Sequence, residues 1–279
     1  MKKEMMRILM LTMIAALVIT GCKKDNDNDT ETESSSDNAI AEAQFDNVAR
    51  QVGDVADANK WLDFWNGGIH VQLNGCANIS VVPADTITWP KTVTIDFGPV
   101  NCTGWDGKMH RGKIIAVFTG RYRNPGTVIS ISFDNYFVNN NKIEGTKTIT
   151  NNGFNNSNHL SYSIVVSNGK ITKPDGSTLT WNSTRTREWI SGYSTQGNHK
   201  DDEYLISGSA SGTSFKGISF AANITQPLLV SPSCKWIMSG IVELTPQGKP
   251  TRTINFGSGN CDDQATITIK NKTFTITLK

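Results

Sequence analysis

The sequence predicts a mainly β protein, in which one long antiparallel meander forms a sandwich or a strongly curved sheet or half-barrel, with one N-terminal amphipathic helix packed on it. Apolar residues alternate with Thr, Ser and Asn throughout residues 67–279, as in a sheet with one buried face. Asn-Gly and Asp-Gly pairs, which favour the positive φ of tight hairpins, recur at 74–75, 106–107, 152–153, 168–169 and 175–176. Helical periodicity is confined to residues 38–66, so nothing connects parallel strands.

The predicted helix over residues 38–66 follows from apolar residues spaced three, four or seven apart. These residues are Phe45, Val48, Val52, Val55 and Leu62. Asp37 or Asn38 is suited to cap its start. Trp61, Phe64 and Trp65 make its end aromatic, and we expect them to seat the helix on the sheet.

Residues 1–21 have the features of a secretion signal. A basic start is followed by an apolar run that is too short to span a bilayer, and the run ends at Ile19-Thr20-Gly21-Cys22. This ending resembles a bacterial lipobox, which implies cleavage before Cys22 and acylation of Cys22, for example by palmitate. Two or three acyl chains hold a protein stably at a membrane, whereas one holds it reversibly.

Residues 22–37 are polar, acidic and without apolar periodicity, so we expect a disordered tether after the lipidated cysteine. Lys23-Lys24 followed by alternating Asp and Asn resembles the surface-export signal of Bacteroidota lipoproteins. That resemblance implies a lipid-anchored protein of the outer membrane that faces the outside of the cell.

Once Cys22 is assigned to lipid, four cysteines remain, an even number typical of an oxidising compartment. Four cysteines allow three pairings, but an internal repeat favours one of them. Residues 92–102 match residues 251–261 at seven of eleven positions, and each copy has a cysteine 26 or 27 residues before its last residue. The predicted disulfides are therefore Cys76–Cys102 and Cys234–Cys261, which bracket the units 76–102 and 234–261. Zinc is disfavoured because the sequence has no CxxC pair.

The chain after residue 21 consists of two segments whose net charges have opposite signs. Residues 22–65 hold four basic and eleven acidic residues, for a net charge of −7, whereas residues 66–279 hold 20 basic and 13 acidic residues, for +7. No long basic run indicates nucleic-acid binding. A mildly basic β body is compatible with affinity for a polyanion such as surface polysaccharide.

No catalytic residue, cofactor or metal site is predicted. The four histidines are isolated, and the sequence has no P-loop, dinucleotide fingerprint or Gly-x-Ser-x-Gly. The densest acidic groups, Asp201-Asp202-Glu203 and Asp262-Asp263, are consecutive residues, and the two carboxylates of a glycosidase must converge across a cleft. The sequence therefore disfavours an enzymatic function without excluding one.

One set of aromatic and basic residues is a candidate glycan contact. Trp105 lies in a predicted turn, and Trp181, Arg185, Arg187 and Trp189 share the parity of one strand face. Such a row could stack on sugar rings. Alternatively, the tryptophans belong to the core and the arginine stems pack on their rings. Thr86, within Asp85-Thr86-Ile87, resembles the O-glycosylation sites of the same bacterial group.

The duplicated Thr-x-Thr-Ile-Asp/Asn-Phe-Gly…Asn-Cys unit and the turn at 102–107 resemble uncharacterised Bacteroidota surface lipoproteins over most of residues 70–279. The resemblance implies a cellular location, the outer face of the outer membrane, but no activity. We expect a non-enzymatic binding or structural module of the cell envelope, whose partners are the membrane, polysaccharide or other envelope proteins. The alternatives are a carrier of a lipid or other hydrophobic ligand and, third, a glycan-active hydrolase. An unfilled apolar cavity beside the helix would favour the carrier.

Overall fold

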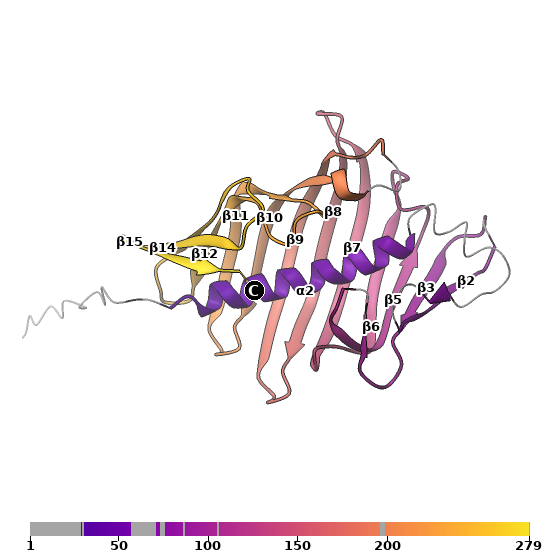
Figure 1. Cartoon of the computed structure of the whole chain (residues 1–279), viewed down its shortest axis with the longest axis horizontal. Coiled ribbons are helices and arrows are strands. Elements are labelled where there is room, and N and C mark those ends of the chain that lie inside the picture. The colour runs from indigo at the N-terminus through magenta and orange to yellow at the C-terminus, as the bar shows by residue number, and fades with distance from the viewer. Residues whose placement is uncertain are drawn as a thin grey trace, which may run out of the picture. The chain divides into compact units, whose positions relative to one another are not determined.

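The structure is a computed structural model that describes residues 29, 31–56, 71–72, 76–85, 87–104, 106–195 and 199–278. Residues 31–279 form one compact unit, to which the following description refers. In its described part, helix α2 (Glu33–Ala56) lies across the strands of a single curved antiparallel sheet (Figure 1). No helix of the described residues is both long and apolar enough to cross a membrane.

Fifteen strands belong to the sheet, and fourteen of them follow one another in chain order. They are β1 (Val71–Gln72), β2 (Asn78–Val82), β3 (Lys91–Asp96), β4 (Cys102–Thr103), β5 (Met109–Phe118), β6 (Val128–Val138), β7 (Asn141–Phe154), β8 (Leu160–Thr172), β9 (Thr178–Ser191), β10 (Glu203–Thr213), β11 (Ser219–Val230), β12 (Ser239–Pro246), β13 (Arg252–Ser258), β14 (Gln264–Ile269) and β15 (Lys272–Thr277). Only β4 leaves this path, where it pairs with β5, and a short helix η1 (His199–Asp201) precedes β10. Of the two predicted forms, the strongly curved sheet is therefore the correct one.

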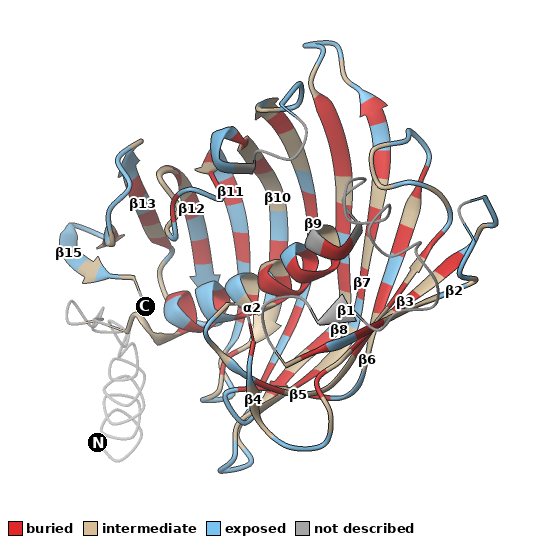
Figure 2. Cartoon of the chain, turned by 45° about the vertical axis from the view of Figure 1, so that its right-hand side comes forward, coloured by how far each residue is buried: buried red, intermediate tan, exposed pale blue. Residues whose placement is uncertain are grey.

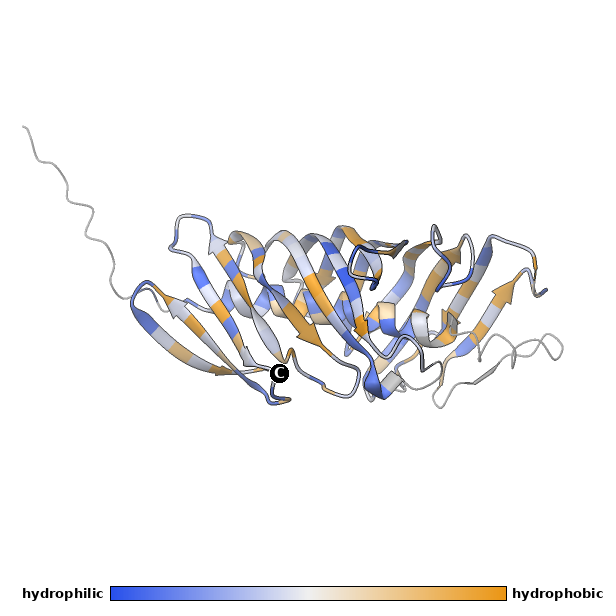
Figure 3. Ribbon diagram, turned by 90° about the horizontal axis from the view of Figure 1, so that it is seen from above, coloured by the Kyte–Doolittle hydropathy of each residue, from blue (hydrophilic) through white to orange (hydrophobic). Residues whose placement is uncertain are grey.

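The period of two in the sequence corresponds to the two faces of the sheet. Ile129 pairs with Ile149, which pairs with Ile164, and all three are buried. Helix α2 lies against the concave face of the sheet (Figure 2). Apolar and polar residues alternate along the strands (Figure 3). One face of the sheet is thus buried against the helix, which is the arrangement that alternation predicts.

Two of the predicted hairpin turns are irregularities inside strands. Asn152-Gly153 lies in β7, where the pairing register shifts between Asn151 and Gly153, and Asn168-Gly169 lies at a similar shift in β8. Gly153 and Asn168 both have positive φ. A β-bulge uses the same backbone freedom as a hairpin turn, so the dipeptide alone does not distinguish them.

Helix α2 begins at Glu33, five residues before the predicted start. The carboxylate of Glu31 caps it, since its Oε1 accepts a hydrogen bond from the backbone N–H of Ser34 at 2.8 Å. Asp37 lies inside the helix and instead accepts a hydrogen bond from the backbone N–H of Phe215 at 2.9 Å. The tether predicted over residues 22–37 is shortened accordingly.

The predicted apolar face of the helix is confirmed in its described part. Phe45, Val48, Val52 and Val55 are each at most 1% exposed. The remaining predicted members of the helix end, which are Leu62, Trp61, Phe64 and Trp65, lie outside the described residues.

Both predicted disulfides are present. The Cα atoms of Cys76 and Cys102 are 6.0 Å apart, and those of Cys234 and Cys261 are 5.7 Å apart. The first bridge ties β4 to the segment that enters β2, and the second ties the segment before β12 to the one after β13.

The sequence repeat is a structural unit in both copies. Asp96 Oδ1 accepts a hydrogen bond from the N–H of Gly98 at 2.8 Å, and Asn255 Oδ1 does the same for Gly257 at 2.9 Å. Both glycines have positive φ. The repeat therefore encodes the same side-chain contact to a positive-φ glycine in both copies, just after β3 and within the last residues of β13, and each copy leads toward a disulfide.

Candidate functional site

Polar side chains of α2 contact inward-facing polar side chains of strands far apart in the sheet. At the start of the helix, Arg252 of β13 donates to Glu31, with 3.2 Å between Nη2 and Oε2. Seven residues after Glu31, the indole N–H of Trp181 donates to Asn38 Oδ1 at 2.9 Å. The helix is thus attached to β13 and β9 through directional contacts as well as through its apolar face.

The next turns continue this pattern. Arg185 forms a two-point contact with Glu42, with Nε–Oε1 and Nη2–Oε2 distances of 3.1 and 2.5 Å. Lys147 of β7 donates to the carbonyl of Phe45 at 2.8 Å and to Asp46 Oδ1 at 3.1 Å. Burial lowers the pKa of Lys147, and the Asp46 charge opposes this shift.

These contacts give a physical reason for the opposite charges of the two halves of the chain. Arg252, Arg185 and Lys147 are at most 4% exposed on the concave face of the sheet, and each pairs with a carboxylate from the segment at the start of the chain. A basic body and an acidic helix segment therefore complement each other within one molecule.

The predicted row on β9 does share one face, but it divides into two groups. Trp181 and Arg185 lie beneath α2, where the Phe45 ring stacks on Trp181 at 5.6 Å between centroids. Arg187 and Trp189 lie further along the strand, among other aromatic residues. This arrangement matches the second interpretation of the row, in which the tryptophans belong to the core and the arginines pack on aromatic rings. The other candidate residues, Trp105, Thr86 and Cys22, lie outside the described residues.

Arg187 and Trp189 belong to a group of residues that we call the rim cluster, at the end of the sheet where η1 lies (Figure 1). Its members come from the β5–β6 loop, the end of β7, the start of β8, the end of β9 and its following turn, and the start of β10. They are Tyr122, Arg123, Phe154, Tyr162, Arg187, Trp189, Tyr193 and Tyr204.

At the centre of the rim cluster, the Arg187 guanidinium lies 4.8 Å from the ring centre of Tyr162 and 5.1 Å from that of Tyr204. Its Nη2 also donates to the hydroxyl of Tyr122. Burial raises the pKa of Tyr162 and Tyr204 well above 10, so both phenols stay protonated beside the cation. Arg187 Nε, Tyr162 Oη and Trp189 Nε1 are buried without a hydrogen-bond partner.

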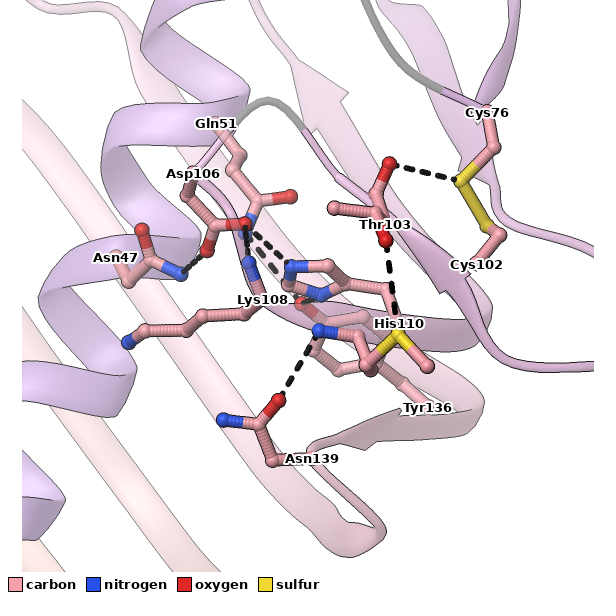
Figure 4. A network of polar contacts seen from close by, with 11 residues as sticks. Asn47, Gln51, Cys76, Cys102, Thr103, Asp106, Lys108, His110, Tyr136 and Asn139 are labelled. Atoms are coloured by element: carbon pink, nitrogen blue, oxygen red, sulfur yellow. Dashed lines mark hydrogen bonds and ion pairs between the residues drawn. A yellow bond between two sulfur atoms is a disulfide. The ribbon is translucent and has the colours of Figure 1, made fainter.

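A second polar group lies near the end of the described helix (Figure 4). His110, which is fully buried, contacts Asp106 Oδ1 through Nε2 at 2.7 Å and the hydroxyl of Tyr136 through Nδ1 at 2.9 Å. Two side chains of α2 complete the group: Asn47 donates to Asp106 Oδ2 at 2.6 Å, and Gln51 donates to Tyr136 at 3.4 Å.

The hydrogen-bond partners of His110 determine which of its ring nitrogens carries a hydrogen. An ionised carboxylate only accepts, so Nε2 of His110 carries a hydrogen. Burial raises the pKa of the Tyr136 phenol well above 10.0, so Tyr136 keeps its proton and can donate to Nδ1. The Phe97 ring also stacks on the imidazole at 4.7 Å. With both nitrogens engaged and the ring buried, the group links the helix to β5 and β6 rather than presenting a base to substrate.

Asp106 is expected to make the free energy of unfolding depend on pH. Burial alone would raise its pKa, but hydrogen bonds from His110 and Asn47 hold the pKa well below the ordinary 3.8. A carboxyl with a lowered native pKa stabilises the fold above its unfolded pKa, and this stabilisation is lost as pH falls. Urea unfolding should therefore show Asp106→Asn to be about 1–3 kcal/mol less stable than wild type at pH 7.

The same difference is expected to shrink as pH is lowered from about 5 towards 2, because the Asp106 carboxyl of the unfolded wild-type chain takes up a proton in this range while the folded carboxyl stays ionised. Asp37 titrates in the opposite sense, since burial raises its pKa, but it is present in both proteins and cancels in the comparison. A difference between wild type and Asp106→Asn that stays constant from pH 7 to pH 2 would contradict this assignment.

The acidic groups singled out in the sequence are engaged in local structure. Asp201 Oδ2 accepts a hydrogen bond from Thr195 at 2.8 Å, and Asp202 Oδ2 accepts one from Tyr204 at 3.1 Å. Asp262 accepts from the backbone N–H of Gln264 at 2.9 Å, and Asp263 accepts from its side chain at 2.6 Å. Among the described residues, no three His, Cys, Asp or Glu side chains are grouped as a metal site would require.

A shallow hollow lies on the outer face of the sheet across β8 to β12. Small and polar side chains line it, among them Thr184, Ser209 and Asn223, which lie opposite one another on adjacent strands. Such a surface offers hydroxyls and amides but no aromatic ring.

No family model matches the chain, and comparisons with curated proteins and with solved structures also find no match. The candidate sites are therefore described by their own geometry alone.

Proposed function

We propose that the chain is a lipid-anchored module of the bacterial outer membrane that faces outward and acts by binding or by scaffolding, without catalysis. The lipobox at Cys22 and the acidic run after it support the address. Two disulfides are consistent with folding in an oxidising compartment. Because α2 begins at Glu33, the tether would hold the β body within at most about 35 Å of the membrane.

The observation that favours a binding or structural module over a hydrophobic carrier is the packing of the concave face. Along the described helix, the apolar residues of α2 are buried against that face, and Asn38, Glu42 and Asp46 contact polar groups of the sheet. The helix thus occupies the space that a lipid would need over these strands. Ligand contacts are then expected at the rim or on the outer face.

Metabolic labelling tests the anchor. Expressed in a Bacteroidota host, the wild-type protein should incorporate radioactive palmitate, and Cys22→Ala should not. The paired variant Cys76→Ala/Cys102→Ala is the control, because it removes two thiols of the β body and should keep the label. Palmitate on Cys22→Ala, or none on wild type, would overturn the lipid anchor.

Protease treatment of intact cells tests the outward orientation. Wild-type protein should be degraded by added proteinase K while a periplasmic marker survives. Replacing Asp25, Asp27 and Asp29 together by alanine should keep the palmitate label but protect the protein, since the acidic run is the proposed export signal. Protection of the wild-type protein in intact cells, but not in lysed cells, would contradict the outward orientation.

A further inference from the structure

We infer that the exposed edge of the rim cluster is a glycan-binding site, in which Phe154 and Tyr193 receive a pyranose ring and Arg123 receives a carboxylate of the sugar. This inference rests on the proposed binding role and assigns a place and a ligand class to it. The three residues come from the end of β7, from the turn after β9 and from the β5–β6 loop. No pattern in the sequence singles out any of them.

Exposure distinguishes Phe154 and Tyr193 from the other aromatic residues described. They are 49% and 37% exposed, and they are the two aromatic members of the set of exposed large apolar side chains in the described part of the chain. Their ring centres are 5.3 Å apart with planes at 86°, so they form an open right-angled corner. We call this pair the aromatic corner. Exposed aromatic rings in contact with each other are typical of a surface that binds a ligand or a partner molecule.

The aromatic corner rests on buried side chains that hold it in place. The Tyr193 ring packs edge-on against Trp189 at 5.5 Å, and Trp189 is 4% exposed. Arg123 donates from Nη1 to the carbonyl of Tyr193 at 3.2 Å, while its guanidinium lies 4.5 Å from the Trp189 ring centre. A ring surface fixed in this way loses little conformational entropy when a ligand binds, which favours binding.

The chemistry of the aromatic corner matches a sugar more closely than a purely apolar ligand. A pyranose has a flat face of C–H groups that packs on an aromatic ring and a periphery of hydroxyls that need hydrogen bonds. Polar groups surround the corner: Asn155 and His159, which follow Phe154, both contact Glu188, at 2.8 and 3.6 Å. Arg123 adds a half-buried planar cation, which suits the bidentate binding of a carboxylate.

Affinity electrophoresis of the lipidated protein in detergent tests the site, with polygalacturonate as the acidic probe and dextran as the neutral control polymer. We expect polygalacturonate to retard the wild-type protein and dextran not to. Phe154→Ala and Tyr193→Ala should each weaken polygalacturonate binding about two- to tenfold, the loss expected for one stacked ring. Arg123→Gln should weaken it by a similar factor and should reduce its dependence on salt.

The matched control is Ile40→Ala, which shortens an apolar side chain of similar exposure, 39%, on α2. It should bind polygalacturonate as wild type does. Thermal unfolding should show that Phe154→Ala and Tyr193→Ala still unfold cooperatively and above the temperature of the electrophoresis, so a loss of binding is not a loss of fold. Equal migration of wild type with and without polygalacturonate would overturn the proposal, as would full binding by both aromatic variants. Because the electrophoresis does not depend on where the protein resides, its failure would leave the membrane anchor and orientation to their own tests.

Discussion

Replacing Glu42 by alanine is expected to lower the free energy of unfolding by about 3–5 kcal/mol. The substitution removes the carboxylate that contacts Arg185 at two points and leaves a guanidinium that is only 4% exposed without its counter-charge. A buried charge without a partner keeps its desolvation cost while it loses the compensating attraction. Urea or guanidinium denaturation of the two proteins at pH 7 measures the difference.

Glu33→Ala is the matched control for this prediction. It also removes a helix glutamate that is paired with a cation, but its partner Lys216 is 65% exposed. An exposed pair of this kind contributes little to stability because water and salt screen it. The intrinsic helix propensity changes by the same small amount in both variants, so the comparison isolates burial. Equal losses of unfolding free energy in the two variants would show that the Arg185 charge does not depend on Glu42 for its compensation.

The double variant Glu42→Leu/Arg185→Leu sharpens the same test. An apolar pair of similar volume removes both charges, and we expect it to recover most of the stability that Glu42→Ala loses. A double-mutant cycle with the two single leucine variants then measures the coupling between the side chains directly.

Phe45→Ala is expected to have an effect of similar size, about 3–5 kcal/mol, by a different mechanism. The Phe45 ring is fully buried, stacks on Trp181 and packs at 6.3 Å against Phe133. The sheet makes room for it at Gly169, where a Cβ atom would approach the ring to 2.9 Å. Alanine leaves a cavity between rigid partners that cannot close around it, and denaturant unfolding measures its cost.

Ile40→Ala provides the control on the same helix. Ile40 is 39% exposed, so its truncation leaves no enclosed cavity, and a loss below about 1 kcal/mol is expected. Phe45→Leu should fall between the two, because leucine fills part of the space. A Phe45→Ala protein as stable as Ile40→Ala would mean that α2 is not held by its apolar face.

The start of α2 shows why local patterns mislocate a helix. The segment before residue 38 is Glu-Ser-Ser-Ser-Asp, which has weak helix propensity and no apolar periodicity. It is helical here because the sheet stabilises it: Ser34 and Ser35 are buried, and Glu31 is paired with Arg252. Arg252 lies 221 residues from Glu31 in the sequence, so no local rule includes this contact.

The β9 row shows a different limit. Alternation correctly places Trp181, Arg185, Arg187 and Trp189 on one face, because the side-chain period of a strand is two. Parity does not reveal what covers that face. Helix α2 covers Trp181 and Arg185, whereas Arg187 and Trp189 lie in the rim cluster. The four side chains therefore share a strand face but lie in two different environments.

The disulfides could be predicted because the repeat duplicates a whole unit, including the side chain that caps each turn. The aromatic corner could not be predicted, because Phe154, Tyr193 and Arg123 lie on three segments with no shared pattern. The pairing register brings the ends of β7 and β9 close together, because Phe154 lies opposite Leu160 and Leu160 lies opposite Trp189.

The meander has a consequence for the order in which the chain can fold. Nearly every strand pairs with its neighbour in sequence, so the sheet can grow hairpin by hairpin at a small entropic cost for each step. The helix cannot do so, because its hydrogen bonds to the sheet span 143 residues at Trp181 and 221 residues at Arg252. Pulse-labelled hydrogen exchange should therefore find the β7–β9 amides protected before those of α2, and the reverse order would contradict this. Docking of the helix would then be the final event, the step that removes the apolar faces of both helix and sheet from water together.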